Sequence, residues 1–455
     1  MTTAAQTLAE FATELQYDRI PGDVIERAKA CVIDTVGACT YGSTLPWSKI
    51  VIGYAEQYGR GGQSTILGTA QKVHAPLAAL ANGALAHAFE MDCLVQPSAG
   101  VHPGASLTAP GLAIAQEVGA SGRDFITAVV AGGEVMHRIG DASKQSTEHI
   151  GFHAPGVTGA FGGAVIAGRL LKLSKDEMAM ALGIAGSLGC GLLEFSKSGG
   201  GMVKRLHLGR AAESGVLAAT LAKNGFSGPA TVLEGKFGYM HVFCHEGDPA
   251  RLTAGLGESW KLLTLALKRY ACHVTSHVPV TAALELQEKH KIQGDDVAAI
   301  TIEGSEKMFS HHNILEPQDM TMAQYSAPFN VALSFYRNPR EPDSFFRSGA
   351  QRSENPRTVP QRESRRAQRP GQEQSAREPG DGEAEGRPRA HLRPAAFSRH
   401  AATAAEPRST AREVHHHHQR GARRARGEGL LGLQRDREGR EHARGNLGDV
   451  PVSLP

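Results

Sequence analysis

Residues 153–171, HAPGVTGAFGGAVIAGRLL, form a long run of small and apolar side chains with five glycines. Glycine lowers helix propensity, so its density within a helix-like run needs a structural reason. Small side chains let two helices approach closely, because the distance between helix axes depends on the side chains at the contact. The stretch therefore predicts a central helix in a closely packed bundle.

The same helical spacing of apolar residues recurs through the first 266 residues. The other helices that it predicts there cover residues 8–15, 22–42, 76–90, 123–139, 173–188 and 209–224, and Pro103 opens a further helix-like run. Further on, the run VAAITI at 297–302 is rich in β-branched residues and predicts a strand, and 325–336 predicts a helix. We expect a mainly α fold, with an all-helical domain at 1–266 and a smaller, truncated α+β domain at 267–346.

The composition changes abruptly after Phe346. Residues 347–455 contain 22 Arg but no Lys, Ile, Met, Tyr, Trp or Cys, and they are rich in Pro, Ala, Gly and Glu. A segment with so few large apolar side chains cannot offset the entropy lost on ordering the chain, so we predict a disordered tail. GC-rich coding DNA read out of frame gives this composition, and we interpret the tail as the product of a frameshift. A natural disordered tail is the alternative.

Charge and cysteine content narrow the class of protein. Residues 1–346 carry 27 Lys and Arg against 32 Asp and Glu, so the positive net charge belongs to the tail. A mildly acidic body argues against nucleic-acid binding. No two of the six cysteines form a CxxC pair, and no apolar run has the length of a membrane span or the pattern of a signal peptide. These features predict a reduced, cytoplasmic protein that binds no membrane.

The stretch 87–107, HAFEMDCLVQPSAGVHPGASL, holds the first candidate site. Asp92 and His102 lie in a loop between two predicted helices, where a ligand can reach them. A solvated loop with a surface Asp and His is the simpler interpretation of this stretch alone.

Four further clusters add groups that could take part in chemistry. They contribute His153 before the glycine-rich helix, Lys204 after a run of glycines, Lys268 and His273 in KRYACH, and Tyr325 in AQYSAPF. Singly, the lysines could be surface charges and the histidines helix caps or core residues. Together with Asp92 and His102, they suit a substrate with several carboxylates and a proton to be moved from carbon. This chemistry requires neither a metal nor a cofactor.

The motifs, taken in order, resemble the MmgE/PrpD family. They are HAFEMD with HPG, GFHAPGVTGAFGGA, KRLHLGRAA, LKRYACH and AQYSAPFNVA, and the resemblance covers residues 5–345. The family includes 2-methylcitrate dehydratase, cis-aconitate decarboxylase and iminodisuccinate epimerase. The resemblance implies a large helical domain, a smaller α+β lid domain, an active site between them, and a homodimer. The active-site positions that it implies are Asp92, His102, His153, Lys204, Lys268, His273 and Tyr325.

The resemblance implies a cofactor-independent lyase that acts on a small polycarboxylate by proton transfer alpha to a carboxylate. Lys204, Lys268 and His102 would bind or polarise carboxylates, and His153 or Asp92 would be the acid or base. One departure leaves the subfamily open: members with the decarboxylase-like loop have an Asp-Asp-Thr run where residues 93–96 read Cys-Leu-Val-Gln. We expect a 2-methylcitrate dehydratase-like hydro-lyase. The alternatives are an epimerase, a decarboxylase, or an impaired remnant with a broken lid.

Overall fold

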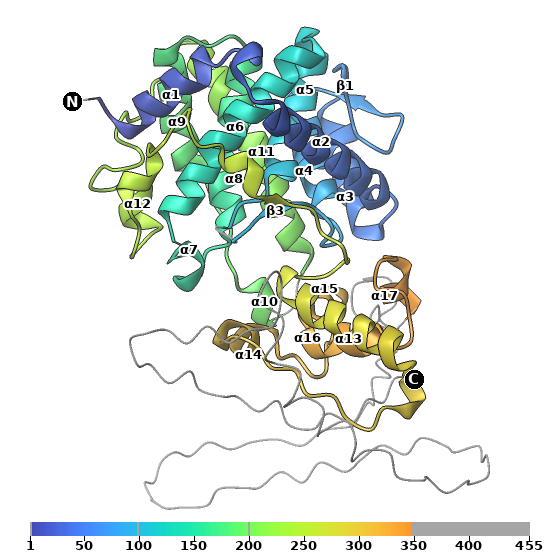
Figure 1. The fold of residues 1–455 in the computed structure, drawn as a ribbon. Helices are drawn as coiled ribbons and strands as arrows, with labels where there is room; N and C mark the ends of the chain where they lie inside the picture. The colour runs from blue at the N-terminus through green and yellow to red at the C-terminus, as the bar shows by residue number, and fades with distance from the viewer. Residues whose placement is uncertain (1, 98–99, 145, 199–200, 348–455) are drawn as a thin grey trace, which may run out of the picture. The chain divides into compact units, whose positions relative to one another are not determined.

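A computed structural model describes residues 2–97, 100–144, 146–198 and 201–347, and it is mainly helical, as predicted (Figure 1). The α-helices are α1 (Ala4–Glu14), α2 (Gly22–Gly42), α3 (Pro46–Tyr58), α4 (Ala75–Ala86), α5 (Ala109–Val118), α6 (Gly122–Ala142), α7 (Ser146–His149), α8 (Ala154–Leu170), α9 (Lys175–Leu188), α10 (Phe195–Ser198), α11 (Met202–Lys223), α12 (Tyr239–Val242), α13 (His277–His290), α14 (Glu306–His312), α15 (Met320–Tyr325), α16 (Ala327–Leu333) and α17 (Asp343–Arg347). The predictions of a disordered or frameshifted tail concern 347–455, which, apart from Arg347, lies outside the described residues.

Helices α8 and α11 lie side by side at the centre of the helical bundle, surrounded by α4, α6 and α9 (Figure 1). Their backbones meet at two glycines: a Cβ atom on Gly215 would lie 2.3 Å from the carbonyl carbon of Gly163. Gly209 brings the other side of α11 equally close to α4, where a Cβ would lie 2.4 Å from Leu80 O. The central helix predicted from the glycine-rich stretch is therefore confirmed, and its glycines serve close packing.

Local signals set the starts of several helices. Ser121 and Asp124 form a capping box at the start of α6, and Ser174 and Glu177 form another at the start of α9. In each box the serine side chain accepts from a backbone N–H that the helix itself leaves unsatisfied. Helix α4 has Pro76 in its first turn, where the missing N–H costs nothing.

Strands are few and short. β1 (Ser64–Thr65) pairs with β2 (Lys72–Val73), and β3 (Leu94–Val95) pairs with β4 (Leu265–Ala266), both antiparallel. The strand predicted at 297–302 is wrong, because these residues have irregular structure. No other strand forms within the described residues 267–347, so this β-branched run has no neighbour with which to form a ladder. Ile300 and Ile302 are instead partly buried against the second core cluster.

Two larger clusters of buried apolar residues hold the described chain together. The first fills the helical bundle, and the second contains Trp47, Phe89, Tyr270, Val331 and Phe345. The Phe89 ring stands edge-on to the Phe345 ring at 6.0 Å and stacks on Trp47 at 6.3 Å. The segment just after α4 is thereby anchored against Trp47, which comes earlier in the chain, and Phe345, which comes much later.

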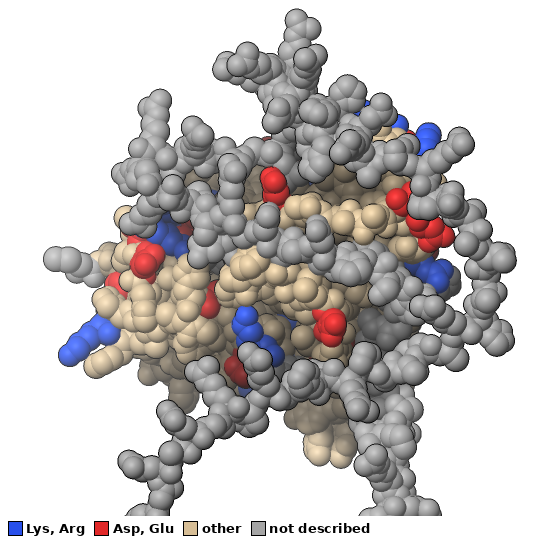
Figure 2. All heavy atoms as spheres, turned by 90° about the horizontal axis from the view of Figure 1, so that it is seen from below, with Lys and Arg blue, Asp and Glu red and all other residues tan. Residues whose placement is uncertain are grey.

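The described surface carries charges of both signs. On the face shown in Figure 2, acidic and basic side chains stand singly or in small groups among uncharged atoms. None of the described helices combines the length and the apolar character that a membrane crossing requires. The lysines of greatest interest lie inside the protein rather than on this surface.

Candidate active site

The segment that follows α4 contributes four polar side chains to one buried cluster. His87 caps the C-terminal end of α4, Glu90 and Asp92 follow it, and His102 lies beyond β3. His87, Glu90 and Asp92 are at most 4% exposed. Buried polar and charged groups are costly unless they have partners, so the contacts of these four residues matter.

Asp92 accepts hydrogen bonds from two histidines. Nδ1 of His87 lies 2.9 Å from both of its carboxylate oxygens, and Nδ1 of His102 lies 2.8 Å from Oδ2. Burial would raise the pKa of Asp92, but the two imidazoles together lower it well below its usual range. Asp92 is therefore a buried carboxylate that orients both rings.

Two lysines share the carboxylate of Glu90. Lys204 Nζ, from the first turn of α11, donates to Oε1, and Lys268 Nζ lies 2.9 Å from Oε2. Burial would raise the pKa of Glu90, but the two ammonium groups hold it well below its usual range. The pKa of Lys204 is lowered, mainly by burial, whereas that of Lys268 is raised because Glu90 and Asp92 outweigh burial.

Lys204 also donates to Nε2 of His87. An ammonium group has no lone pair, so His87 Nε2 must accept and its proton must sit on Nδ1, facing Asp92. Burial, the largest cause, lowers the pKa of His87 to about 4, so this ring is neutral near pH 7. A hydrogen-bonded chain thus runs from Glu90 through Lys204 and His87 to Asp92.

The ligand atoms of His87, Asp92 and His102 lie within 4.8 Å of one another, a spacing that could suit a metal ion. The hydrogen bonds of these three residues, however, do not suit a metal ion. With Lys204 donating to Nε2, His87 carries its proton on Nδ1 and offers no lone pair on the side facing Asp92. The chemistry of this group favours a proton-carrying network over a cation site.

His153 faces the same cluster from the start of α8. Its ring centre lies 5.8 Å from that of His87, and its Nδ1 lies 3.1 Å from Nδ1 of His207. One of these two nitrogens must donate and the other accept, so the tautomers of His153 and His207 are linked. Burial and, to a lesser degree, Lys204 lower the pKa of His153 well below its usual value, which favours the neutral ring.

His273 and Tyr325 complete the cluster from the later part of the chain. The Thr275 backbone N–H donates to His273 Nδ1, so a neutral His273 carries its proton on Nε2. The His273 ring lies 4.8 Å from that of Tyr325, and Lys204 Nζ lies 5.6 Å from the Tyr325 ring centre. Burial lowers the pKa of His273, and burial and Glu90 raise that of Tyr325.

Gln324 fixes this part of the cluster to the segment after α4. Its side-chain amide donates to Phe89 O at 2.9 Å and to Ala271 O at 3.0 Å, while its backbone carbonyl accepts from the His273 N–H at 2.9 Å. Gln324 thus connects the segment around Glu90 with the segments around Lys268 and Tyr325.

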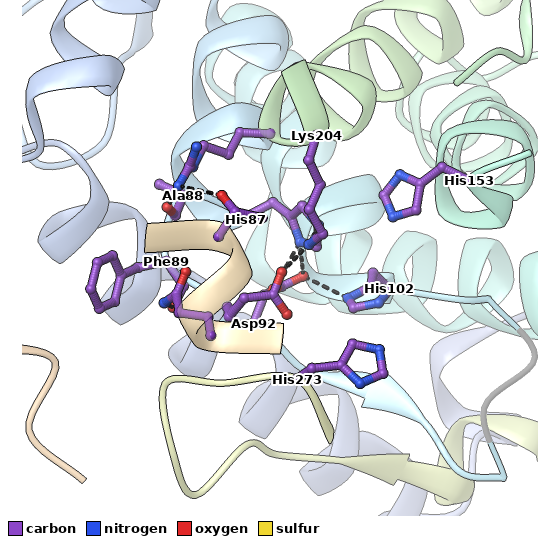
Figure 3. Close-up of polar contacts among 12 residues, drawn as sticks. His87, Ala88, Phe89, Asp92, His102, His153, Lys204 and His273 are labelled. Carbon is purple, nitrogen blue, oxygen red and sulfur yellow. Dashed lines mark hydrogen bonds and ion pairs between the residues drawn. The ribbon is translucent and has the colours of Figure 1, made fainter. Parts of the chain in front are cut away.

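The structure brings all seven sequence-predicted residues into one network of contacts, although their part in catalysis stays a prediction. Figure 3 shows His87, Asp92, His102 and Lys204 pointing toward one another, with His153 and His273 beside them. Sequence reasoning did not single out His87, Glu90, His207 or Gln324. Two of these had a readable signal: His87 begins HAFEMD, the motif that ends in Asp92, and His207 lies three residues after Lys204 in KRLH.

Comparisons with known proteins identify the family of this chain. Residues 6–252 match the model of the MmgE/PrpD N-terminal domain. Since this match covers more than half of the chain, the protein belongs to the MmgE/PrpD family.

Several relatives have a stated activity. A cis-aconitate decarboxylase of Aspergillus terreus is 35% identical over 297 residues, which cover 62% of this chain and 60% of the relative. The Homo sapiens cis-aconitate decarboxylase is 30% identical over 293 residues, with coverage of 62% and 60%. A cis-aconitate decarboxylase-like protein of Aspergillus oryzae is 29% identical over 346 residues, 71% of each chain. The chain thus spans about 60% of the length of the two decarboxylases.

Proposed function

We propose that this protein is a cofactor-independent lyase that decarboxylates a small unsaturated polycarboxylate of the cis-aconitate type. One observation carries the proposal: two buried lysines share one carboxylate beside a histidine that a buried aspartate orients. Such an arrangement supplies cations for substrate carboxylates and an imidazole for moving a proton. The relatives named as cis-aconitate decarboxylases favour this reaction over the dehydration expected from the motifs.

The lysines keep donors for a substrate. An ammonium group has three N–H donors. Among the described residues, Lys204 uses two of them, on Glu90 and His87, and Lys268 uses one, on Glu90. Three donors therefore stay available, enough to hold one substrate carboxylate through both lysines.

His102 is the group best suited to transfer the proton. Its Nδ1 donates to Asp92, which leaves Nε2 on the opposite side of a ring that is 13% exposed. In the proposed reaction the bond from carbon to one carboxylate breaks and CO₂ leaves. The electron pair passes into the conjugated skeleton, and His102, as an imidazolium with protons on both ring nitrogens, delivers its Nε2 proton to carbon there and regains a proton from water. Lys204 and Lys268 stabilise the negative charge that develops, an effect that is strong in a site with little water.

Substrate assays test the proposal. The full chain is incubated separately with cis-aconitate, 2-methylcitrate and iminodisuccinate, and release of CO₂, loss of water and change of configuration are followed. We expect CO₂ from cis-aconitate, and a loss of roughly 100-fold or more in Lys204→Ala and His153→Ala. Lys29→Ala, at an exposed residue of α2, is the matched control and should keep full activity.

Each outcome separates the candidates. Water loss from 2-methylcitrate, or epimerisation of iminodisuccinate, would replace decarboxylation as the function. Binding of these compounds without turnover would support an impaired remnant. Activity that survived both site substitutions unchanged would refute the site.

A further inference from the structure

Glu90 occupies an unusual place between two cations. It is 4% exposed, and its two carboxylate oxygens are divided between Lys204 and Lys268, which lie 114 and 178 positions away in the sequence. Because each lysine contacts a different oxygen, the carboxylate sets the separation of the two ammonium groups. No other buried carboxylate among the described residues binds two lysines in this way.

The backbone at Glu90 adopts a conformation that costs free energy. Its φ angle is +56°, in the left-handed region that residues with a side chain rarely adopt. Such strain persists where surrounding contacts hold it, and it clusters at functional sites. At this position the turn directs a long acidic side chain inward, to the two lysines.

We propose that Glu90 is a positioning residue that holds Lys204 and Lys268 together as the paired cation that takes a substrate carboxylate. The inference rests on the proposed function, and it adds a residue that does not itself meet the reacting atoms. Glu90 binds one side of the lysine pair, and the substrate carboxylate uses the N–H donors that Glu90 leaves.

Electrostatics explain why the lysine pair needs this carboxylate. The titratable groups that face Lys204, besides Glu90, are Lys268, His87, Asp92, His153, His207, His273 and Tyr325. Of these only Asp92 is an anion, and two imidazoles already donate to it. Without Glu90, two buried ammonium groups would repel each other with no carboxylate between them, and Lys204 would lose its proton more readily.

Binding of a non-reacting polycarboxylate at two pH values tests the inference. Tricarballylate is titrated calorimetrically into wild type and Glu90→Gln at pH 6 and pH 8. At each pH, the Kd of Glu90→Gln is divided by the Kd of wild type. This ratio cancels the effect that protonation of the ligand itself has on binding. We expect Glu90→Gln to bind at least tenfold more weakly than wild type at pH 8, with a smaller ratio at pH 6, where Lys204 regains its proton. A purely structural role would give the same ratio at both pH values.

Two further variants complete the experiment. Glu134→Gln removes another buried carboxylate, which pairs with Arg138 at 2.7 Å in α6, and its ratio should not depend on pH. Glu90→Asp keeps the charge but is too short to reach both lysines, so its ratio should fall between those of wild type and Glu90→Gln. If Glu90→Gln does not unfold cooperatively on heating, and so is not properly folded, Glu90→Asp takes its place as the variant that tests the inference.

Equal or tighter binding by the Glu90 variants at pH 8 would overturn the inference while leaving the proposed function intact. Failure of wild type to bind tricarballylate and cis-aconitate would count against the proposed function instead.

Discussion

At the scale of single residues, the two hydrogen bonds to Asp92 should matter most for catalysis. Asp92→Asn puts an amide with its own N–H donors against imidazoles that already donate, so His102 must turn or change tautomer. We expect kcat to fall by about 10²- to 10⁴-fold with little change in thermal stability. Steady-state assays on cis-aconitate would measure this.

The exposed Asp176→Asn in α9 is the matched control for that substitution. If Asp92→Asn kept the wild-type kcat, His102 would not depend on Asp92 for its orientation, and the proton-transfer role proposed for it would be untenable.

The sequence revealed some of these residues better than others. Asp92 and His102 lie in a short loop between two predicted helices, and local reasoning finds such a pair. Glu90 was not singled out because its importance comes from Lys268, 178 positions away, and no local pattern announces that contact. His207 lies one helical turn after Lys204 in α11, so the spacing in KRLH could have indicated it.

At the scale of elements, the glycine contact between α8 and α11 makes a specific prediction. Gly215→Ala would place a Cβ 2.3 Å from the backbone of Gly163, and two packed helices cannot yield without moving apart. We expect a destabilisation of about 1–3 kcal/mol or more, seen as a lower midpoint in thermal or denaturant unfolding.

Gly37 in α2 provides the opposite case. A Cβ there meets nothing within 4 Å, so Gly37→Ala should stabilise the protein by about 0.5–1 kcal/mol through helix propensity alone. If the two substitutions shifted the midpoint equally, close packing would not be the reason for the glycine at 215.

Helices were predicted well where their own residues define them, and less well where they depend on neighbours. The capping box at Ser121 marks the start of α6 in the sequence itself. The segment 297–302 has the composition of a strand, but a strand exists only with a partner, and none lies nearby in the described chain. Residues 104–108 form a turn of π-helix before α5, which apolar spacing alone did not indicate.

At the scale of the whole molecule, buried histidines should make stability depend on pH. Burial lowers the pKa of His137 from its usual value of about 6.5 to about 4. Between these values the unfolded chain binds a proton that the folded protein does not. The contribution of His137 to the free energy of unfolding is therefore fully present above pH 6.5 and is lost as the pH drops toward 4.

Denaturant unfolding between pH 4.5 and 7.5 would measure this dependence. His137→Leu should reduce the slope by up to one proton, about 1.4 kcal/mol per pH unit, whatever its effect on stability at neutral pH. His245→Gln, at an exposed position, should leave the slope as it is. An unchanged slope in His137→Leu would mean that this ring titrates equally in the folded and unfolded states.

The homodimer and the cytoplasmic location expected from the sequence stay predictions.

The hydrogen bonds of Gln324 have a consequence for how the site comes into being during synthesis. Its side chain reaches back 235 positions to Phe89, so the ribosome has released the whole helical bundle before this connection can form. Until then, the segment around Glu90 is not connected to the segment that carries Tyr325. Contacts between residues so distant in sequence form slowly, because a long loop must close first. The helical bundle can thus exist for a time as a folded body whose active centre is still incomplete.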